Sequence, residues 1–156
     1  MIPQVEIVCS TGWKPAGRRL SRYLAACLKD LRMPSASLTL LVCGDARSRA
    51  LNRLHRHHDR PTDILSFPAE AGRQRPGFSG YLGDLALNAA YVRRRFPRFA
   101  DRLGEEQGYL LLHGVLHLAG FHHDDPAQER RLEALQERAF ARLRGLARLP
   151  LIQPCS

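Results

Sequence analysis

The feature that most constrains this chain is an apolar stretch, residues 109–118, in which two histidines are embedded. His113 and His117 are four residues apart, a spacing that puts two side chains one turn apart on the same helix face. Gly120 then predicts a turn, because helices commonly end at a glycine in the left-handed conformation. His123 lies just beyond this turn, where the returning chain can bring its ring over the first two.

Three imidazole rings brought together in this way predict a metal site. A histidine pair alone on an apolar helix is equally compatible with ordinary packing or hydrogen bonding. The third ring favours a metal, because burying three rings together without a shared partner would be costly. Structural zinc sites usually close with four ligands rich in cysteine, whereas three protein ligands leave a position for water, as in catalytic sites. We therefore expect His113, His117 and His123 to hold one Zn2+ ion.

The residue after the first histidine argues against one class of metalloenzyme. Zincin metallopeptidases carry H-E-x-x-H, in which the glutamate acts as general base, and this chain has Gly114 at that position. A peptidase or amidohydrolase would need a carboxylate from elsewhere, for example Glu70 or Asp84. That alternative stays open.

Composition points to the kind of partner and compartment. Basic residues outnumber acidic ones 24 to 15, for a net charge of +9, which favours polyanionic partners such as RNA. A GC-rich genome would also produce many arginines. The four cysteines form no C-x-x-C pair, which predicts free thiols in a reducing compartment. No stretch approaches the roughly eighteen apolar residues of a membrane span, so we expect a cytoplasmic protein.

Hydrophobic periodicity predicts the elements around the histidines. One domain spanning 1–156 is expected from the length, with a loose tail at about 151–156. Asp45, Asp101 and Asp125 stand where helix N-caps are expected. Strands are predicted at 5–10, 37–43, 62–67 and 81–87, the last two as sheet neighbours, and helices at 17–31, 46–56, 88–95, 126–144 and from about 101 through the histidines.

The histidine stretch resembles the H-G-x-L-H-L-x-G-[FY]-x-H signature of the YbeY family, bacterial metal-dependent single-strand endoribonucleases of ribosomal RNA maturation and ribosome quality control. The resemblance continues at 52–56 (N-R-L-H-R), at 61–68, which is similar to P-T-D-V-L-S-F-P, and at 83–87 (G-D-L-A-L). The family commonly has aspartate just before its last histidine, where this chain has His122. The spacing selects His123 as the ligand.

The resemblance implies a fold and a function. The fold is α+β, a mixed four-stranded sheet with helices mainly on one face and the metal-binding helix central. The function is zinc-dependent cleavage of single-stranded RNA in 16S ribosomal RNA 3′ end maturation. Ribosomal RNA precursor and the small ribosomal subunit are the implied partners, and neither DNA nor membrane is expected. The alternative is a non-catalytic, ribosome-associated factor with a structural metal, which would unfold when zinc is removed.

Two further residues are implied to act at the site. Arg56 falls where the family pattern has its functional arginine, and a guanidinium can hold a phosphate through two hydrogen bonds. It could also be a surface arginine without a role. Asp84 would lie near the metal and orient a ligand histidine or position a water, or it could simply end a strand. Zinc would lower the pKa of its bound water and polarise a phosphoryl oxygen, and the nucleophile is either that water or the RNA 2′-hydroxyl.

Overall fold

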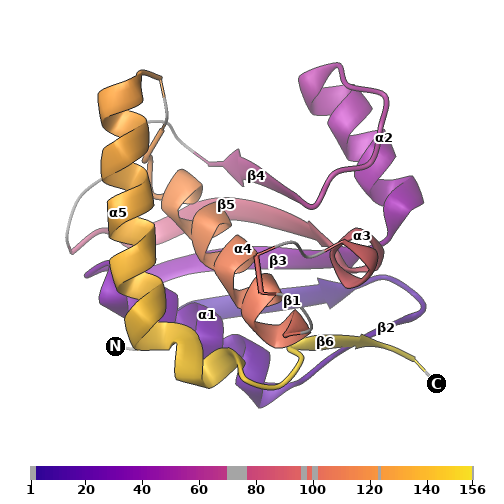
Figure 1. Cartoon of the computed structure of the whole chain (residues 1–156), viewed down its shortest axis with the longest axis horizontal. Helices are drawn as coiled ribbons and strands as arrows, with labels where there is room; N and C mark the ends of the chain where they lie inside the picture. The colour runs from indigo at the N-terminus through magenta and orange to yellow at the C-terminus, as the bar shows by residue number, and fades with distance from the viewer. Residues whose placement is uncertain (1–2, 70–76, 96–97, 100–101, 123, 156) are drawn as a thin grey trace.

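The computed structural model describes residues 3–69, 77–95, 98–99, 102–122 and 124–155. No helix within these ranges is both long and apolar enough to cross a bilayer. The elements, shown in chain order in Figure 1, are β1 (Gln4–Cys9), β2 (Trp13–Pro15), α1 (Arg18–Asp30), β3 (Ser35–Cys43), α2 (Asp45–Arg56), β4 (Ile64–Pro68), β5 (Ser79–Asn88), α3 (Ala89–Arg94), α4 (Leu103–Leu118), α5 (Pro126–Leu143), the 3-10 helix η1 (Arg144–Ala147) and β6 (Ile152–Pro154).

Four strands form the main sheet, in the order β1-β3-β5-β4. β1, β3 and β5 run parallel, and β4 joins the edge antiparallel to β5. Ile64 lies opposite Leu87, and Phe67 lies opposite Asp84, so the two strands expected to be neighbours do pair. Buried residues alternate with less buried ones along β3, as in a sheet that packs a core on one face. The prediction of a mixed four-stranded sheet is confirmed.

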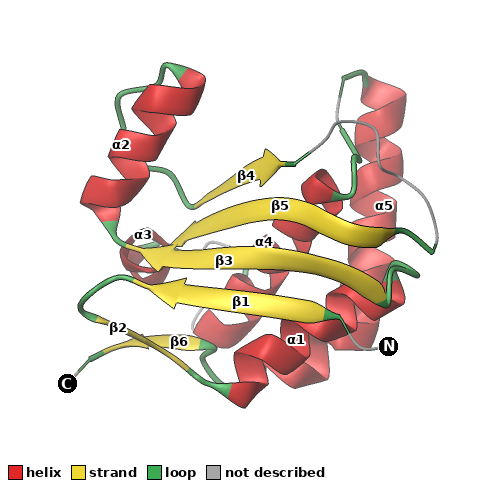
Figure 2. Ribbon diagram, turned by 180° about the vertical axis from the view of Figure 1, so that it is seen from behind, coloured by secondary structure: helices red, strands yellow, loops and turns green. Residues whose placement is uncertain are grey.

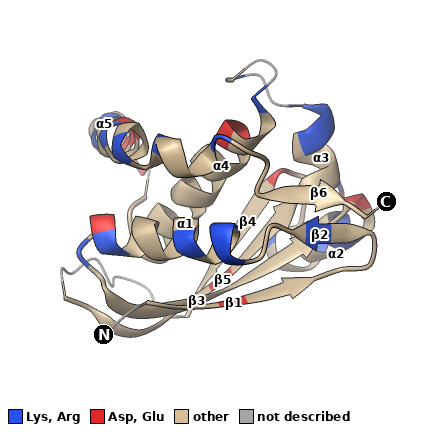
Figure 3. Ribbon diagram, turned by 90° about the horizontal axis from the view of Figure 1, so that it is seen from below, with Lys and Arg blue, Asp and Glu red and all other residues tan. Residues whose placement is uncertain are grey.

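The helix that carries the histidines lies at the centre of the core. Helices α1, α4 and α5 lie on one side of the sheet (Figure 3), and in Figure 2 no described helix crosses β1, β3 or β5 on the other side. Most residues of α4 are buried, including the polar Glu105, Glu106 and Gln107 in its first turns. Leu111, Leu112, Val115 and Leu116 are fully buried, and α4 packs against β4, β5, α1 and α5. The expected central helix is confirmed.

Two glycines on α4 allow other parts of the chain to approach it closely. A Cβ atom at Gly104 would lie 2.5 Å from the carbonyl oxygen of Ala147 and closer still to that of Leu149. At Gly108 it would lie 3.0 Å from the Tyr23 ring, whose hydroxyl donates a hydrogen bond to the Gly108 carbonyl. The first half of α4 therefore has no room for side chains on this side.

The end of the chain forms a strand, so the prediction of a loose tail was wrong for the described part of it. β6 pairs antiparallel with β2, and Trp13 lies opposite Pro154. Leu151 and Ile152 are buried, because both apolar side chains join the core beside α4. The buried Gln107 side chain holds them: its Oε1 accepts from both backbone N–H groups, and its Nε2 donates to the Ile152 carbonyl.

The expected helix caps are found in part. Asp125 is the N-cap of α5, and its carboxylate accepts a hydrogen bond from the backbone N–H three residues later. The prediction for α2 was wrong, because Gly44 is the N-cap and the helix begins at Asp45. The carboxylate of Asp45 instead takes two hydrogen bonds from Arg94, a charged donor that binds it more strongly than a backbone N–H would. Asp101 lies outside the described residues.

All four cysteines are free thiols, as the sequence predicted. Burial raises the pKa of Cys43 to about 11 and raises that of Cys27 as well. Cys155 is exposed. The two buried thiols are therefore held in the protonated form, which is the unreactive one.

Candidate active site

The two helical histidines converge as their spacing predicted. The rings of His113 and His117 lie 4.5 Å apart between centroids at an angle of 72°. Their Nε2 atoms are 2.9 Å apart. In a tetrahedral zinc site with bonds of about 2.0–2.1 Å, two nitrogen ligands lie about 3.3 Å apart. The pair therefore fits a shared zinc ion after a movement of a few tenths of an ångström.

The third ligand stays a prediction. His123 lies outside the residues that the structure describes. Among the residues that are described, no group of three histidine, cysteine, aspartate or glutamate side chains is placed to hold a metal. The described residues thus include two of the three predicted ligands, whose Nε2 atoms converge.

A buried glutamine supports the first histidine. Gln136 on α5 is 3% exposed, and its Oε1 atom lies 2.9 Å from Nδ1 of His113. Its Nε2 donates to the carbonyl oxygen of Tyr109, one turn earlier on α4. Sequence reasoning missed this residue. The available signal was a polar residue on the apolar face that α5 forms with Leu132 and Ala139.

The histidine pair opens into a cavity of about 520 Å³, a volume within the usual range of ligand sites. The end of α2, strand β4, helix α4 and the loop after α4 supply its walls. Its described lining comprises Arg56, Asp63, Ile64, Ser66, Pro68, Arg98, Tyr109, Leu110, His113, His117, His122 and Asp124.

Arg56 lies in this cavity with the histidines, as the resemblance implied. It is the last residue of α2, and the next residue, His57, ends the helix in the left-handed conformation with φ of 60°. The Arg56 guanidinium donates one hydrogen bond, 3.3 Å long, to the backbone carbonyl of Ser66 on β4. Among the described residues it has no carboxylate partner, so the rest of its fork is available to an anion.

A second arginine of the cavity was not predicted. Arg98 pairs with Glu106, whose carboxylate is fully buried and also accepts the Arg98 backbone N–H. Its guanidinium lies 5.0 Å from the centroid of the Tyr109 ring, in cation–π contact. Arg98 follows a proline outside any periodic segment, so no sequence pattern indicated it. Its charge is fixed in place, unlike that of Arg56.

Gly114 leaves no room for a zincin-type base. A Cβ atom there would lie 2.8 Å from Cδ2 of Leu85 and 2.9 Å from Cδ1 of Ile64. A side chain at this position would therefore collide with side chains of β4 and β5. Glu70, the other carboxylate considered as a base, lies outside the described residues.

Comparison with known proteins identifies the family. Residues 13–144 match the family model described as Endoribonuclease YbeY. The chain belongs to the YbeY endoribonuclease family. The match includes both helical histidines, Arg56 and three strands of the main sheet, β3, β4 and β5, whereas β1 lies before its first residue.

Individual YbeY proteins show the same similarity. An Endoribonuclease YbeY of an Anaeromyxobacter species is 40% identical over 133 residues, which cover 85% of this chain and 67% of the relative. For the protein of Anaeromyxobacter dehalogenans the identity is 40% and the shares are 84% and 66%, so the chain spans about two thirds of these relatives. The protein of Syntrophotalea carbinolica is 37% identical, with shares of 84% and 89%.

A solved structure confirms the fold. A solution structure of a Thermotoga maritima protein superimposes with a TM-score of 0.56 and covers 91% of this chain and 93% of its own. The two sequences are 20% identical. This likeness supports the YbeY-type α+β architecture alone.

Asp84, implied by the YbeY resemblance to lie near the metal, is placed on the other face of the sheet. Its neighbour Leu85 packs toward Gly114 of α4, and successive strand residues face opposite ways. Asp84 is exposed and accepts a hydrogen bond from Tyr81, whose pKa is raised by desolvation and by this bond. It lines a second cavity, of about 780 Å³, whose lining includes Arg56 but neither His113 nor His117. Its suggested role at the metal stays a prediction.

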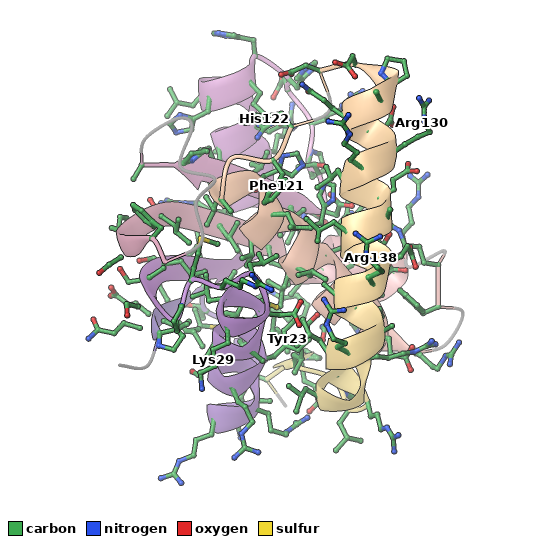
Figure 4. All side chains as sticks on the ribbon, turned by 90° about the vertical axis from the view of Figure 1, so that its left-hand side faces the viewer. Tyr23, Lys29, Phe121, His122, Arg130 and Arg138 are labelled. Atoms are coloured by element: carbon green, nitrogen blue, oxygen red, sulfur yellow. The ribbon has the colours of Figure 1, made fainter. Side chains whose placement is uncertain are left out.

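His122, which replaces the usual YbeY aspartate, also lines the histidine cavity. It lies in the loop between α4 and α5 (Figure 4), and its ring centroid is 6.4 Å from that of His117. The turn that brings it there passes through Gly120, whose φ of 97° confirms the predicted left-handed glycine. This chain therefore offers a further imidazole in the cavity beside His113 and His117.

Proposed function

We propose that this chain is a zinc-dependent endoribonuclease that cleaves single-stranded RNA. We further propose that it acts in the cytoplasm on ribosomal RNA precursor in the small ribosomal subunit, in 16S RNA 3′ end maturation and ribosome quality control. The observation that carries the proposal is the convergence of the His113 and His117 Nε2 atoms, 2.9 Å apart, in a cavity they share with Arg56. Family membership supports RNA as the substrate.

In the proposed site His113, His117 and His123 hold the Zn2+ ion. When bound, zinc supplies a Lewis acid that polarises a phosphoryl oxygen and makes water a stronger acid. The cavity beside the histidine pair receives the scissile phosphate. Leu110 and Ile64 form an apolar part of its lining.

The two arginines have different roles in this mechanism. Arg56 binds the scissile phosphate through the part of its fork that does not contact Ser66, and offsets the charge that gathers on the phosphate oxygens. Arg98 is already paired with Glu106, so it positions the neighbouring backbone of the RNA. The exposed basic residues of α1 and α3, visible in Figure 3, add long-range attraction for the strand.

Asp84 enters the proposal only as an indirect residue. Its carboxylate lies across the sheet from α4, so any effect on the histidines passes through β5 and the packing of Leu85 against Gly114. Replacing Asp84 by asparagine is therefore expected to leave zinc content unchanged.

The test combines metal analysis with cleavage of single-stranded RNA. The His113→Ala variant is expected to lose both zinc and activity. Arg56→Ala is expected to keep zinc and to lose about 100-fold or more in cleavage rate. Matched controls are His58→Ala and Arg53→Ala, which change exposed residues that do not line the cavity. Wild-type rates for both His113→Ala and Arg56→Ala would refute the proposal.

Analysis of the product ends identifies the nucleophile. Attack by water leaves a 5′-phosphate or a 3′-phosphate, whereas attack by the RNA 2′-hydroxyl leaves a cyclic 2′,3′-phosphate. A substrate with a single 2′-deoxynucleotide at the cleavage site separates the two routes, because only the second route requires that hydroxyl.

A further inference from the structure

We propose that Gln136 is a positioning residue that fixes the tautomer of His113 and so presents the lone pair of its Nε2 atom to the metal. The inference rests on the proposed zinc site. It concerns a residue of α5, outside the helix and loop that carry the histidines. The steps follow from the hydrogen bonds of one buried amide.

The orientation of the Gln136 amide is set by Tyr109. The Gln136 Nε2 atom lies 3.2 Å from the carbonyl oxygen of Tyr109. A carbonyl oxygen can only accept a hydrogen bond, so the NH2 end of the amide must face it. A flipped amide would place two acceptors against each other. The Oε1 end is thereby directed at His113, 2.9 Å from its Nδ1 atom.

The orientation of the amide determines where the His113 proton resides. Oε1 of Gln136 can only accept, so Nδ1 of His113 must carry the hydrogen of this bond. A neutral imidazole has one N–H group, and Nε2 is then the unprotonated nitrogen. This is the atom that faces His117, and an unprotonated nitrogen is what a metal ion requires.

Nε2 of His113 and Nε2 of His117 are 2.9 Å apart. With its hydrogen held on Nδ1, His113 is already in the form that binds a cation at this position. Gln136 thus prepares one ligand in advance, as the outer partners of metal-binding histidines do.

The Gln136 side chain is fixed in one orientation, which keeps its Oε1 atom directed at Nδ1 of His113. The residue is 3% exposed and lies on the face of α5 that is buried against α4. A buried side chain with both amide ends bonded cannot reorient without breaking a hydrogen bond. The neutral amide also leaves the charge of the site to the histidines and the metal.

Zinc affinity of the whole chain, measured by competition with a chromogenic chelator, tests the proposal. Gln136→Leu removes the acceptor and is expected to weaken zinc binding about 10–100-fold. Gln136→Glu keeps an acceptor at this position and is expected to retain or tighten zinc binding. Gln107→Leu is the matched control, since Gln107 is equally buried and bonded at both amide ends but lies away from the histidines. It is expected to lower stability and leave zinc affinity unchanged.

The tautomer is measured separately on the metal-free wild-type chain by long-range ¹⁵N–¹H spectroscopy, at a pH where the rings are neutral. The expected result is a protonated Nδ1 and a bare Nε2 at His113. A protonated Nε2 there, or wild-type zinc affinity in Gln136→Leu, would overturn the role of Gln136. A wild-type chain that binds no zinc would instead overturn the proposed function, and the spectrum would still decide the tautomer.

Discussion

Replacing Gly104 by alanine tests the close packing that holds the histidine helix. The new Cβ atom would lie 2.5 Å from the Ala147 carbonyl oxygen, and closer to that of Leu149, whereas such contacts normally exceed about 3.4 Å. The backbone of residues 147–149 must therefore move by about 1 Å. Overpacking of this kind costs about 1–3 kcal/mol, here near the upper end because both opposing atoms are backbone.

The expected net loss follows from subtracting the gain in helix propensity. Alanine stabilises a helix by about 1 kcal/mol relative to glycine. The free energy of unfolding is therefore expected to fall by about 2 kcal/mol. For a chain of this size that corresponds to a fall in Tm of about 4–8 °C. Urea unfolding followed by circular dichroism measures the free energy, and a thermal scan measures the Tm.

Gly145→Ala provides the control for this measurement. Nothing lies within 4 Å of a Cβ atom at Gly145, on η1, so its stability is expected to stay within about 0.5 kcal/mol of wild type. If Gly104→Ala were as stable as Gly145→Ala, the close approach of 147–149 to α4 would be refuted. RNA cleavage at a temperature where both variants are folded should be unchanged, because Gly104 is more than two turns from His113.

Three further predictions concern ligand choice, thiol reactivity and pH dependence. His123→Ala should abolish zinc binding whereas His122→Ala should retain it, as measured by zinc content after purification without chelator; the opposite result would make His122 the third ligand. In the native chain Cys155 should react with a thiol reagent at pH 8 and Cys43 should not, because burial raises the pKa of Cys43 to about 11; fast labelling of Cys43, located by mass spectrometry, would contradict its burial. The hydrogen bond from the Arg94 guanidinium, at the end of α3, lowers the pKa of the Asp45 carboxyl. The contribution of this pair to stability is therefore present above the unfolded pKa of about 3.9 and is lost as the pH falls through the lower pKa of the folded state. Asp45→Asn should therefore lower the free energy of unfolding by less than about 1 kcal/mol at pH 7, since this pair is partly exposed. The difference in urea midpoint from wild type should shrink below the unfolded pKa and vanish once the pH is below the lowered pKa of Asp45; a difference that persists there would rule out the ionised pair as its cause.

The elements that sequence predicted well are those with a strong local pattern. The apolar run around His113 gave the position of α4, and Gly120 gave the turn that ends it, because both depend on neighbouring residues. The alternation around Leu85 likewise gave the position of β5. Alternation does not indicate which face of the sheet the helices cover. The helices pack on the face opposite Asp84, so Asp84 lies away from the histidines.

The features that sequence missed are non-local. β2 and β6 have three residues each, and they pair although Trp13 and Pro154 lie near opposite ends of the sequence. No local sequence pattern therefore predicts these two strands. Arg98 reaches the cavity because Glu106 binds it, and Gln136 reaches His113 because α5 packs on α4. Each of these depends on a tertiary contact between segments whose own sequences are unremarkable.

The C-terminal segment has a consequence for synthesis. Translation produces α4 well before it produces Leu151 and Ile152, which bond to Gln107 on that helix. Residues 147–149, which lie against Gly104, are also made late. A nascent chain therefore carries its histidines on a helix whose first half still lacks part of its packing, and that packing is completed only once these residues have left the exit tunnel.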